Sequence, residues 1–535
     1  MADSELHVAR ASSVMALGTA LSRITGFMRS ILLVATLGTG ILGDTYNVGN
    51  TMPNIIYNLL IGGSMTAVFV PQIVRAFRNK DGGEKFISAL VSLISSILIL
   101  ITAVSMSLTP FLVSLYAPTF QGRARDITIA FTLFCLPQVL FYGIYGILGQ
   151  ITNARERFGP MMWAPIANNL LAISLFSFFL YKYPNISLSD ISDSQVRLLG
   201  LGTTAGIVLQ AIILIPFLRG NGFSLRFTWK WRGLGLRHSL KLGSWTLISL
   251  FVSQLGFLAT VNLATRAGVS ATSAGISYGA GYTPYANAYL ILLLPHSIIA
   301  ISVATAILPQ LSNLVIDKNL DRIKLQISQA LRLIAIPIVP ASFFFLFFGS
   351  FITQVIFPGI DSDSARYLGE VLSAFSLAAI PLAMNLVGIR TLNAFENTKL
   401  QALSNAVINL IALIISIIFY FSLPAEKVTL GLALAFTLSY WLGIWVTDRY
   451  LARYLGTQIL RSQLGFYLRL SLLSLVTVGA VWSVTIWIGN EWVGIERNIA
   501  TLFVVLLAAA SLYLALAKFF KIEEVGQTIR LFLRR

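Results

Sequence analysis

The sequence predicts an all-α polytopic membrane protein with about 14 transmembrane helices. Of its 535 residues, 56% are hydrophobic and only 11% are charged, and the mean hydropathy is +0.80. This composition is typical of a chain that lies largely in lipid. The apolar segments are long enough to cross about 30 Å of hydrocarbon, and short loops rich in Lys, Arg, Gly or Pro separate them. The loops are too short for a water-soluble catalytic domain.

The predicted segments group into two lobes and a C-terminal pair. Residues 1–218 hold six segments, a basic loop at 219–241 follows, residues 242–453 hold six more, and 454–535 hold two extra helices and a basic tail. The segments are 11–42, 45–74, 86–116, 127–150, 160–181, 198–218, 239–265, 283–311, 327–349, 367–389, 400–422, 428–447, 464–489 and 498–518.

The first segment carries two arginines, Arg23 and Arg29, inside an otherwise apolar stretch. The apolar run before Arg23 covers residues 11–22, and the run after Arg29 covers 30–42. Since about 20 helical residues are needed to cross the hydrocarbon, neither run spans alone. At least one arginine therefore lies within the membrane, where it is costly unless it faces water, a partner or an anionic ligand.

The second segment places five polar side chains within an arc of about 120° on one helix, with Pro53 among them as an expected kink. One interpretation is that the amides join neighbouring helices while the arginines reach toward the head groups. We favour a hydrated cationic cavity, because the polar groups are too many for one interface. The stripe consists of Asp44, Asn47, Asn50, Asn54 and Asn58.

The distribution of Lys and Arg predicts that both termini lie in the cytoplasm. Loops on the N-terminal side hold 26 of these residues and the opposite loops hold 8. The remaining four, Arg23, Arg29, Arg332 and Arg469, lie in helices. This asymmetry and contact with anionic lipid explain the net charge of +17, so no nucleic-acid partner is expected.

An internal repeat with an offset of 240 residues relates the two lobes. TPFLVSLYAP at 109–118 aligns with GSFITQVIFP at 349–358, and NARERF at 153–158 aligns with NAFENT at 393–398. Because six spans are an even number, both lobes start on the same side, and the repeat is parallel with a pseudo-two-fold axis along the membrane normal. Two such lobes with polar inner helices predict an alternating-access transporter.

Catalysis is not expected, so the protein is predicted to be a transporter and not an enzyme. His7, His238 and His296 are scattered without metal-ligand spacing. The single Cys135 excludes an internal disulfide and a cysteine zinc site.

A tyrosine-rich approach to the eighth segment adds candidates in the second lobe. Tyr278, Tyr282, Tyr285 and Tyr289 recur at helical spacing. They form either an aromatic belt at the membrane interface or a lining that stacks on or hydrogen-bonds a sugar, and both interpretations stay open.

Six stretches carry a resemblance to a known family: SRITGFMR (22–29), GDTYNVGNTMPN (43–54), GGSMTAVFVPQ (62–72), TNARERFGPMMWAP (152–165), TAILPQL (305–311) and GLALAFTLSYW (431–441). The chain resembles the MurJ (MviN) lipid II flippases of the multidrug/oligosaccharidyl-lipid/polysaccharide exporter superfamily over nearly its whole length. The resemblance implies a V-shaped pair of lobes around a cationic central cavity, with a groove for the lipid tail at the last two helices.

The resemblance also implies roles for particular residues. Arg23 and Arg29 match the family's cavity arginines, and Asp44 and Asn54 match its polar cavity residues. The implied function is translocation of the undecaprenyl-pyrophosphate-linked peptidoglycan precursor, lipid II, from the inner to the outer leaflet for cell-wall biogenesis.

The sequence departs from the family pattern at two positions. Tyr57 and Leu290 stand where some relatives carry further cavity arginines, and Arg266 is a candidate replacement. The predicted substrate-binding residues are Arg23, Arg29, Asp44, Asn47, Asn50, Asn54, Asn58, Arg266 and Tyr285.

A sodium site implied by the resemblance uses carboxylates on the seventh, eleventh and twelfth helices. Asn405 and Asn409 lie at the matching spacing with Thr437 as a third candidate ligand, but the seventh helix offers no carboxylate. No cofactor is therefore expected, and the energy source is left open between a sodium ion and the membrane potential.

The residue chemistry agrees with the implied ligand class. Arginines without a mid-membrane carboxylate favour an anion such as a pyrophosphate, which guanidinium binds bidentately. The alternatives are a flippase for another polyprenyl-linked polysaccharide unit and a drug or cation antiporter of the same superfamily. Expected partners are the lipid-linked precursor and membrane lipids, with cell-wall synthesis or division proteins as candidates, and the expected location is the bacterial cytoplasmic membrane.

Overall fold

The structure is a computed structural model of the whole chain. It describes residues 2–59, 73, 76–77, 83–155, 157, 159–219, 226–229, 236–491, 499–520, 522 and 524–526, with side chains from residue 17 onward except at 219, 236–243 and 489–491. These residues form two compact units, Met1–Val269 and Ser270–Arg535. Each unit is described by itself below.

The predicted all-α fold class is confirmed, because every regular element in the described ranges is a helix. Twelve of these helices are long and apolar enough to cross a membrane, and a pair bent by 46°, Ser362–Ser376 and Ala379–Ala394, adds a thirteenth candidate. Each of the 14 predicted segments overlaps a helix. The second segment begins on a helix at Ile41–Tyr57, and its residues 60–72, with the motif at 62–72, lie outside the described residues.

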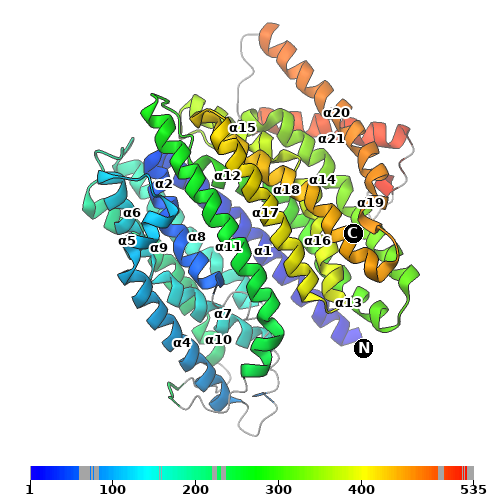
Figure 1. Cartoon of the computed structure of the whole chain (residues 1–535), viewed down its shortest axis with the longest axis horizontal. Helices are drawn as coiled ribbons and strands as arrows, with labels where there is room; N and C mark the ends of the chain where they lie inside the picture. The colour runs from blue at the N-terminus through cyan, green and yellow to red at the C-terminus, as the bar shows by residue number, and fades with distance from the viewer. Residues whose placement is uncertain are drawn as a thin grey trace. The chain divides into compact units, whose positions relative to one another are not determined.

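The first unit packs around one buried aromatic residue. Tyr46 meets Phe131 and Phe176 edge-on, with ring centroids 5.3 and 5.8 Å apart. This cluster joins α2, α6 and α8 (Figure 1). The helices of the unit are α1 (Ala2–Leu37), α2 (Ile41–Tyr57), α4 (Glu84–Ser107), α5 (Thr109–Tyr116), α6 (Gly122–Cys135), α7 (Gln138–Ala154), α8 (Gly159–Lys182), α9 (Asp193–Ile212), α10 (Ile215–Arg219) and most of α11 (Leu236–Ser273).

The second unit is built on the long helix α14, which packs closely on α15 (Figure 1). A Cβ atom on Gly349 would lie 2.5 Å from the carbonyl oxygen of Gly369, so the two backbones touch at these glycines. The elements are α12 (Tyr282–Pro295), η3 (His296–Ala300), α13 (Ile301–Ile316), α14 (Leu320–Ile356), α15 (Ser362–Ser376), α16 (Ala379–Ala394), α17 (Thr398–Ser422), α18 (Ala425–Leu455), α19 (Ile459–Ser462), α20 (Leu464–Glu491) and α21 (Ile499–Phe519).

Helix boundaries reproduce the internal repeat. α6 begins at Gly122 and α15 begins at Ser362, which is 240 residues later. α8 ends at Lys182 and α17 ends at Ser422, again 240 residues apart. The sequence repeat therefore marks equivalent helices in the two units.

Helix α11 belongs to the first unit by its contacts, although the sequence analysis ends the first lobe at residue 218. Asn262 donates from Nδ2 to the Leu115 carbonyl over 2.7 Å, and Thr265 donates from Oγ1 to the Tyr116 carbonyl over 3.1 Å. Both bonds fix the C-terminal part of α11 against the end of α5. The four predicted domain limits stay a prediction.

Candidate functional site

The two arginines of α1 lie on different faces of that helix. Arg23 is exposed, whereas Arg29 is partly buried and acts electrostatically on Tyr46 and Tyr142. Within the part of the chain that the structure describes, neither guanidinium has a carboxylate oxygen within 4.0 Å. The positive charges of α1 are therefore available to an anion.

Helix α8 holds α1 in place beside these arginines. Asn169 on α8 donates from Nδ2 to the Ser22 carbonyl over 2.9 Å and to the Thr25 hydroxyl over 3.0 Å. The helices approach closely because α1 is small at this face: a Cβ on Gly18 would lie 2.7 Å from Nε1 of Trp163. Since Asn169 is 6% exposed, its two hydrogen bonds are sheltered from competing water.

The polar stripe of α2 divides into a buried end and an exposed end. Asp44 is buried in the first turn, where a carboxylate is favoured by the helix dipole. Asn47 and Asn50 are partly buried. Asn54 is exposed and accepts a hydrogen bond from Nδ2 of Asn58 over 2.6 Å. The exposed end of the stripe is the part that solvent or a ligand can reach.

Helix α7 supplies two polar partners that the sequence analysis missed. Gln138 is fully buried and donates from Nε2 to Asn50 Oδ1 over 3.4 Å and to Thr204 Oγ1 over 3.2 Å. Tyr142, one turn later, hydrogen bonds to the Asn54 side chain. The signal was a Gln and a Tyr at i, i+4 in an apolar segment, just after Pro137.

Both interpretations of the stripe therefore apply to different parts of it. Asn50 joins α2 to α7, as the packing interpretation expects. Asn54 instead meets Tyr142, which the charge of Arg29 also acts on. The first unit thus combines guanidinium, amide and phenol groups on α1, α2 and α7, which can bind an anion and the hydroxyls of a sugar.

Arg266 is held by its own helix. Its Nε donates to Asn262 Oδ1 over 2.8 Å, and Asn262 is fixed in turn by the Leu115 carbonyl. The role of Arg266 as a replacement for a missing cavity arginine stays a prediction.

Tyr285 lies in an aromatic cluster of the second unit. It is 7% exposed, and its ring meets Phe375 edge-on at a centroid distance of 4.9 Å. Tyr289 and Phe436 pack on the same phenylalanine. This packing covers much of the Tyr285 ring, and its predicted contact with a substrate stays a prediction.

Two of the three sodium candidates, Asn409 and Thr437, donate to backbone carbonyls. Asn409 donates from Nδ2 to the Asn405 carbonyl over 2.8 Å, and Thr437 donates from Oγ1 to the Ala374 carbonyl over 2.9 Å. Among the described residues, no group of three His, Cys, Asp or Glu side chains could hold a metal. The sodium candidates stay a prediction.

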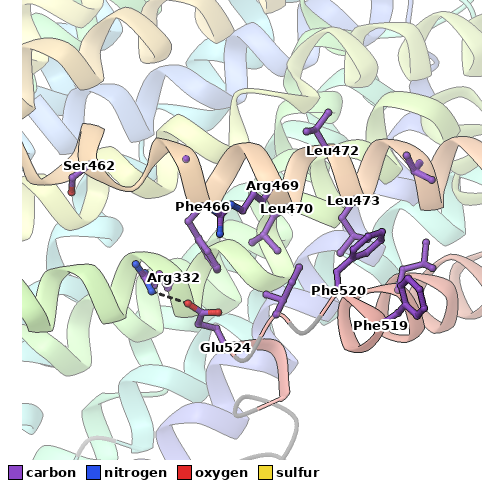
Figure 2. A pocket seen from close by; sticks show the side chains of 14 residues that line it. Arg332, Ser462, Phe466, Arg469, Leu470, Leu472, Leu473, Phe519, Phe520 and Glu524 are labelled. Carbon is purple, nitrogen blue, oxygen red and sulfur yellow. Dashed lines mark hydrogen bonds and ion pairs between the residues drawn. The ribbon is translucent and has the colours of Figure 1, made fainter.

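A cavity lies in the second unit, between α14, α20 and α21. Its volume is about 810 Å³. Figure 2 shows Arg332, Glu524 and Ser462 toward one end, Arg469 near the middle, and Leu473, Phe519 and Phe520 toward the other end. The Arg332 guanidinium and the Glu524 carboxylate are 2.7 Å apart. The cavity is therefore amphipathic, with an apolar part suited to a hydrocarbon chain.

A family model described as "Lipid II flippase MurJ" matches residues 33–506 of this chain. The chain belongs to this family. It is accordingly a multi-pass membrane transporter of a bacterial flippase family and not an enzyme, as the sequence predicted.

Individual relatives cover nearly the whole chain at low identity. A probable lipid II flippase MurJ of Thermotoga maritima is 23% identical over 517 residues, covering 96% of this chain and 97% of the relative. Its counterpart in Rhizobium meliloti is 22% identical over 519 residues, covering 93% and 91%.

Solved structures share the fold. A structure titled "Lipid II flippase MurJ, inward closed conformation" has a TM-score of 0.74 at 19% identity and covers 95% of this chain and 99% of its own. An inward-facing multidrug resistance transporter of the MATE family, in the MOP superfamily, has a TM-score of 0.65 at 15% identity, with 81% and 96% covered. The fold is therefore common to transporters of unlike cargo, and the cargo must be inferred from the site.

Proposed function

We propose that the protein is a lipid II flippase, which moves the undecaprenyl-pyrophosphate-linked peptidoglycan precursor from the inner to the outer leaflet by alternating access. Membership of the MurJ family supports this substrate. The observation that carries the proposal is the pair of α1 arginines, which meet no carboxylate within 4.0 Å in the described chain.

The head group is bound by the first unit. Arg23 and Arg29 neutralise the pyrophosphate, since guanidinium forms paired hydrogen bonds with phosphate oxygens. The exposed amide of Asn54 and the nearby Tyr142 hydroxyl bond to the sugar hydroxyls or the peptide. The charges on α1 therefore supply attraction for the pyrophosphate, and the polar groups on α2 and α7 orient the sugar or the peptide.

The lipid tail remains in an apolar environment while the head group crosses. The cavity between α14, α20 and α21 offers Leu470, Leu473 and Phe519 to a hydrocarbon chain. A tail in this cavity keeps its contacts with apolar atoms, so it need not enter water. We assign the cavity to part of the polyprenyl tail on this basis.

The orientation and the energy source follow from charge. The Lys and Arg asymmetry supports cytoplasmic termini. An inside-negative membrane potential then favours outward movement of a negatively charged head group, by about 2.3 kcal/mol per charge for each 100 mV. The potential is therefore the proposed driving force, and division or cell-wall synthesis proteins are proposed only as partners that supply or consume the substrate.

The test is complementation of a bacterium depleted of its own lipid II flippase. The wild-type chain should restore growth, and Arg23→Ala and Arg29→Ala should each abolish it while reaching normal membrane levels. Arg197→Ala is the matched control, because Arg197 is an exposed arginine on α9 of the same unit. It should rescue as well as the wild type.

Two outcomes would overturn the proposal. Rescue by both α1 variants would refute binding of the head group by these arginines. Failure of the wild-type chain to rescue at full expression, together with no flipping of purified lipid II in vesicles, would refute the substrate.

A further inference from the structure

A short extended segment between α10 and α11 is fastened to the side of α4. The backbone N–H of Arg226 donates to Oγ of Ser88 over 3.2 Å, and the N–H of Thr228 donates to Oγ of Ser92 over 3.0 Å. Ser88 and Ser92 are one turn apart on α4 and are 5% and 3% exposed. The segment 226–229 therefore lies along α4 in a fixed register.

The segment turns two large aromatic side chains away from the protein. Side chains alternate along an extended chain, so Phe227 and Trp229 share one face. Their rings meet edge-on with centroids 5.1 Å apart, and they are 62% and 70% exposed. A paired Phe and Trp at this exposure mark a surface that contacts something other than water.

Helix α4 places this pair at the edge of a bilayer. Its large apolar side chains Ile99, Leu100 and Val104 are exposed, as expected of a helix that faces lipid, and α4 lies at the rim of the first unit in Figure 1. Its 24 residues span about 36 Å, which exceeds about 30 Å of hydrocarbon. Ser88 lies one turn after the start of α4, so the segment lies near the depth of the lipid head groups, where Trp is favoured.

The charge of this part of the chain identifies the lipid. Residues 219–241 contain six Lys or Arg and no Asp or Glu, and basic residues flank the aromatic ones in the run RFTWKWR at 226–232. In the proposed orientation this region faces the cytoplasmic leaflet, whose anionic lipids attract basic segments. Aromatic residues at the interface combined with positive charge fit an anionic phospholipid surface.

We propose that residues 226–229 form an interfacial anchor that binds anionic phospholipid of the cytoplasmic leaflet. Phe227 and Trp229 insert among the head groups, and Arg226 pairs with a lipid phosphate. Because the segment lies between α10 and α11, the anchor holds this connection at the membrane surface. The inference uses the proposed orientation and is independent of lipid II as the cargo.

The experiment measures contact between Trp229 and lipid in the intact protein. The full chain is reconstituted in vesicles of equal parts phosphatidylcholine and phosphatidylglycerol, in which one or the other lipid carries bromine on its acyl chains. Bromine quenches tryptophan fluorescence on contact. The difference in fluorescence between the wild type and Trp229→Phe is the signal of Trp229. The difference between the wild type and Trp487→Phe gives the signal of a control tryptophan, which is 63% exposed on α20.

Trp229 should be quenched more by brominated phosphatidylglycerol than by brominated phosphatidylcholine. Arg226→Gln should reduce this preference, with about a fivefold loss of affinity for one basic residue. Trp487 should respond equally to both lipids. Exposed residues are replaced in each case, so thermal unfolding of the variants should match that of the wild type.

A second variant tests the attachment itself. Ser88→Ala combined with Ser92→Ala removes both acceptors and should lower the quenching of Trp229 while leaving that of Trp487 unchanged. Trp229 that is not quenched by either lipid would overturn the anchor, and equal quenching by both lipids would overturn its preference for anionic lipid. Neither result would bear on transport of lipid II, which the complementation experiment decides separately.

Discussion

Equivalent asparagines of the internal repeat form different hydrogen bonds in the two units. Asn169 on α8 and Asn409 on α17 are 240 residues apart, as are the ends of their helices. Asn169 donates to the carbonyl of Ser22 and the hydroxyl of Thr25 on α1. Asn409 donates to the Asn405 carbonyl in its own helix. One amide therefore positions a neighbouring helix, and the other does not.

The difference between the two asparagines indicates that equivalent helices have different roles in the two units. In the first unit, the polar contact fixes the helix that carries two arginines without a carboxylate in reach. In the second unit, two arginines near the C-terminal helices are paired: Arg332 with Glu524 and Arg461 with Asp448. The two arginines of α1 are left available, whereas Arg332 and Arg461 are neutralised where they attach the segment after α21 and α19.

The largest expected effect is a difference in flipping rate between variants of Asn169 and Asn409. Asn169→Ala removes both bonds to α1, and the loss of about 1.4 kcal/mol of positioning energy should reduce the rate of lipid II flipping in vesicles about tenfold. Asn409→Ala is the matched control and should stay within about twofold of the wild type, since it loses only a bond within its helix. Equal rates for the two variants would contradict the comparison.

The next effect tests neutralisation in the second unit. Asp448 is 0% exposed and accepts from the backbone N–H groups of Leu460 and Arg461 over 2.9 and 3.1 Å, and from Arg461 Nε over 3.3 Å. Asp448→Asn leaves Arg461 without its carboxylate and should lower stability by about 3 kcal/mol in a thermal unfolding assay.

An exposed carboxylate provides the control for that measurement. Asp363 pairs with Arg366 over 2.7 Å, but its side chain is 61% exposed. Asp363→Asn should therefore shift unfolding far less than Asp448→Asn. Similar shifts in unfolding temperature for both variants would show that the burial of Asp448 does not determine its contribution to stability.

A smaller effect is expected where α14 meets α15. A Cβ on Gly369 would lie 2.2 Å from the Cα of Ser350, so Gly369→Ala must push the two helices apart at a cost of about 2 kcal/mol. On α20 of the same unit, a Cβ on Gly479 would come no closer than 3.7 Å to Phe347. Gly479→Ala should therefore leave the unfolding temperature unchanged or raise it slightly, and a drop equal to that of Gly369→Ala would refute the close crossing.

The smallest effect concerns the pair at the C-terminal cavity. The side chains of Arg332 and Glu524 are 43% and 29% exposed, so water screens much of their attraction. Glu524→Gln should cost less than about 1 kcal/mol, because Gln463 still accepts from Arg332 Nε over 2.9 Å. A loss of stability as large as that of Asp448→Asn would mean that the exposed pair Arg332–Glu524 contributes as much as the buried pair Arg461–Asp448.

The sequence predicted the fold at the level of spanning segments. Hydrophobic length alone located a helix for every predicted segment, because the cost of leaving backbone groups unpaired in lipid forces each such segment to be helical. The repeat was visible in aligned motifs, and the helix ends at Lys182 and Ser422 confirm its offset. The family was evident from motifs such as SRITGFMR, and the family model matches residues 33–506.

The candidate site was only partly predictable. The arginines stood out because charge is rare in apolar segments, and the periodicity of α2 showed that its polar residues share a face. Periodicity cannot show which helix covers that face. Gln138 and Tyr142 were missed for this reason, although they meet Asn50 and Asn54. Tyr285 was selected by spacing, and the structure surrounds it with aromatic residues.

The sequence by itself determined that this protein spans a membrane, that at least one arginine lies within it and that the chain repeats. These properties depend on local hydrophobicity and on the cost of burying charge, both of which are read one segment at a time. Only the tertiary structure decided which polar groups are paired and that Asn169 holds α1. It also decided that Phe227 and Trp229 are turned outward along α4. Such contacts join residues far apart in the chain, and they depend on which helix faces pack together.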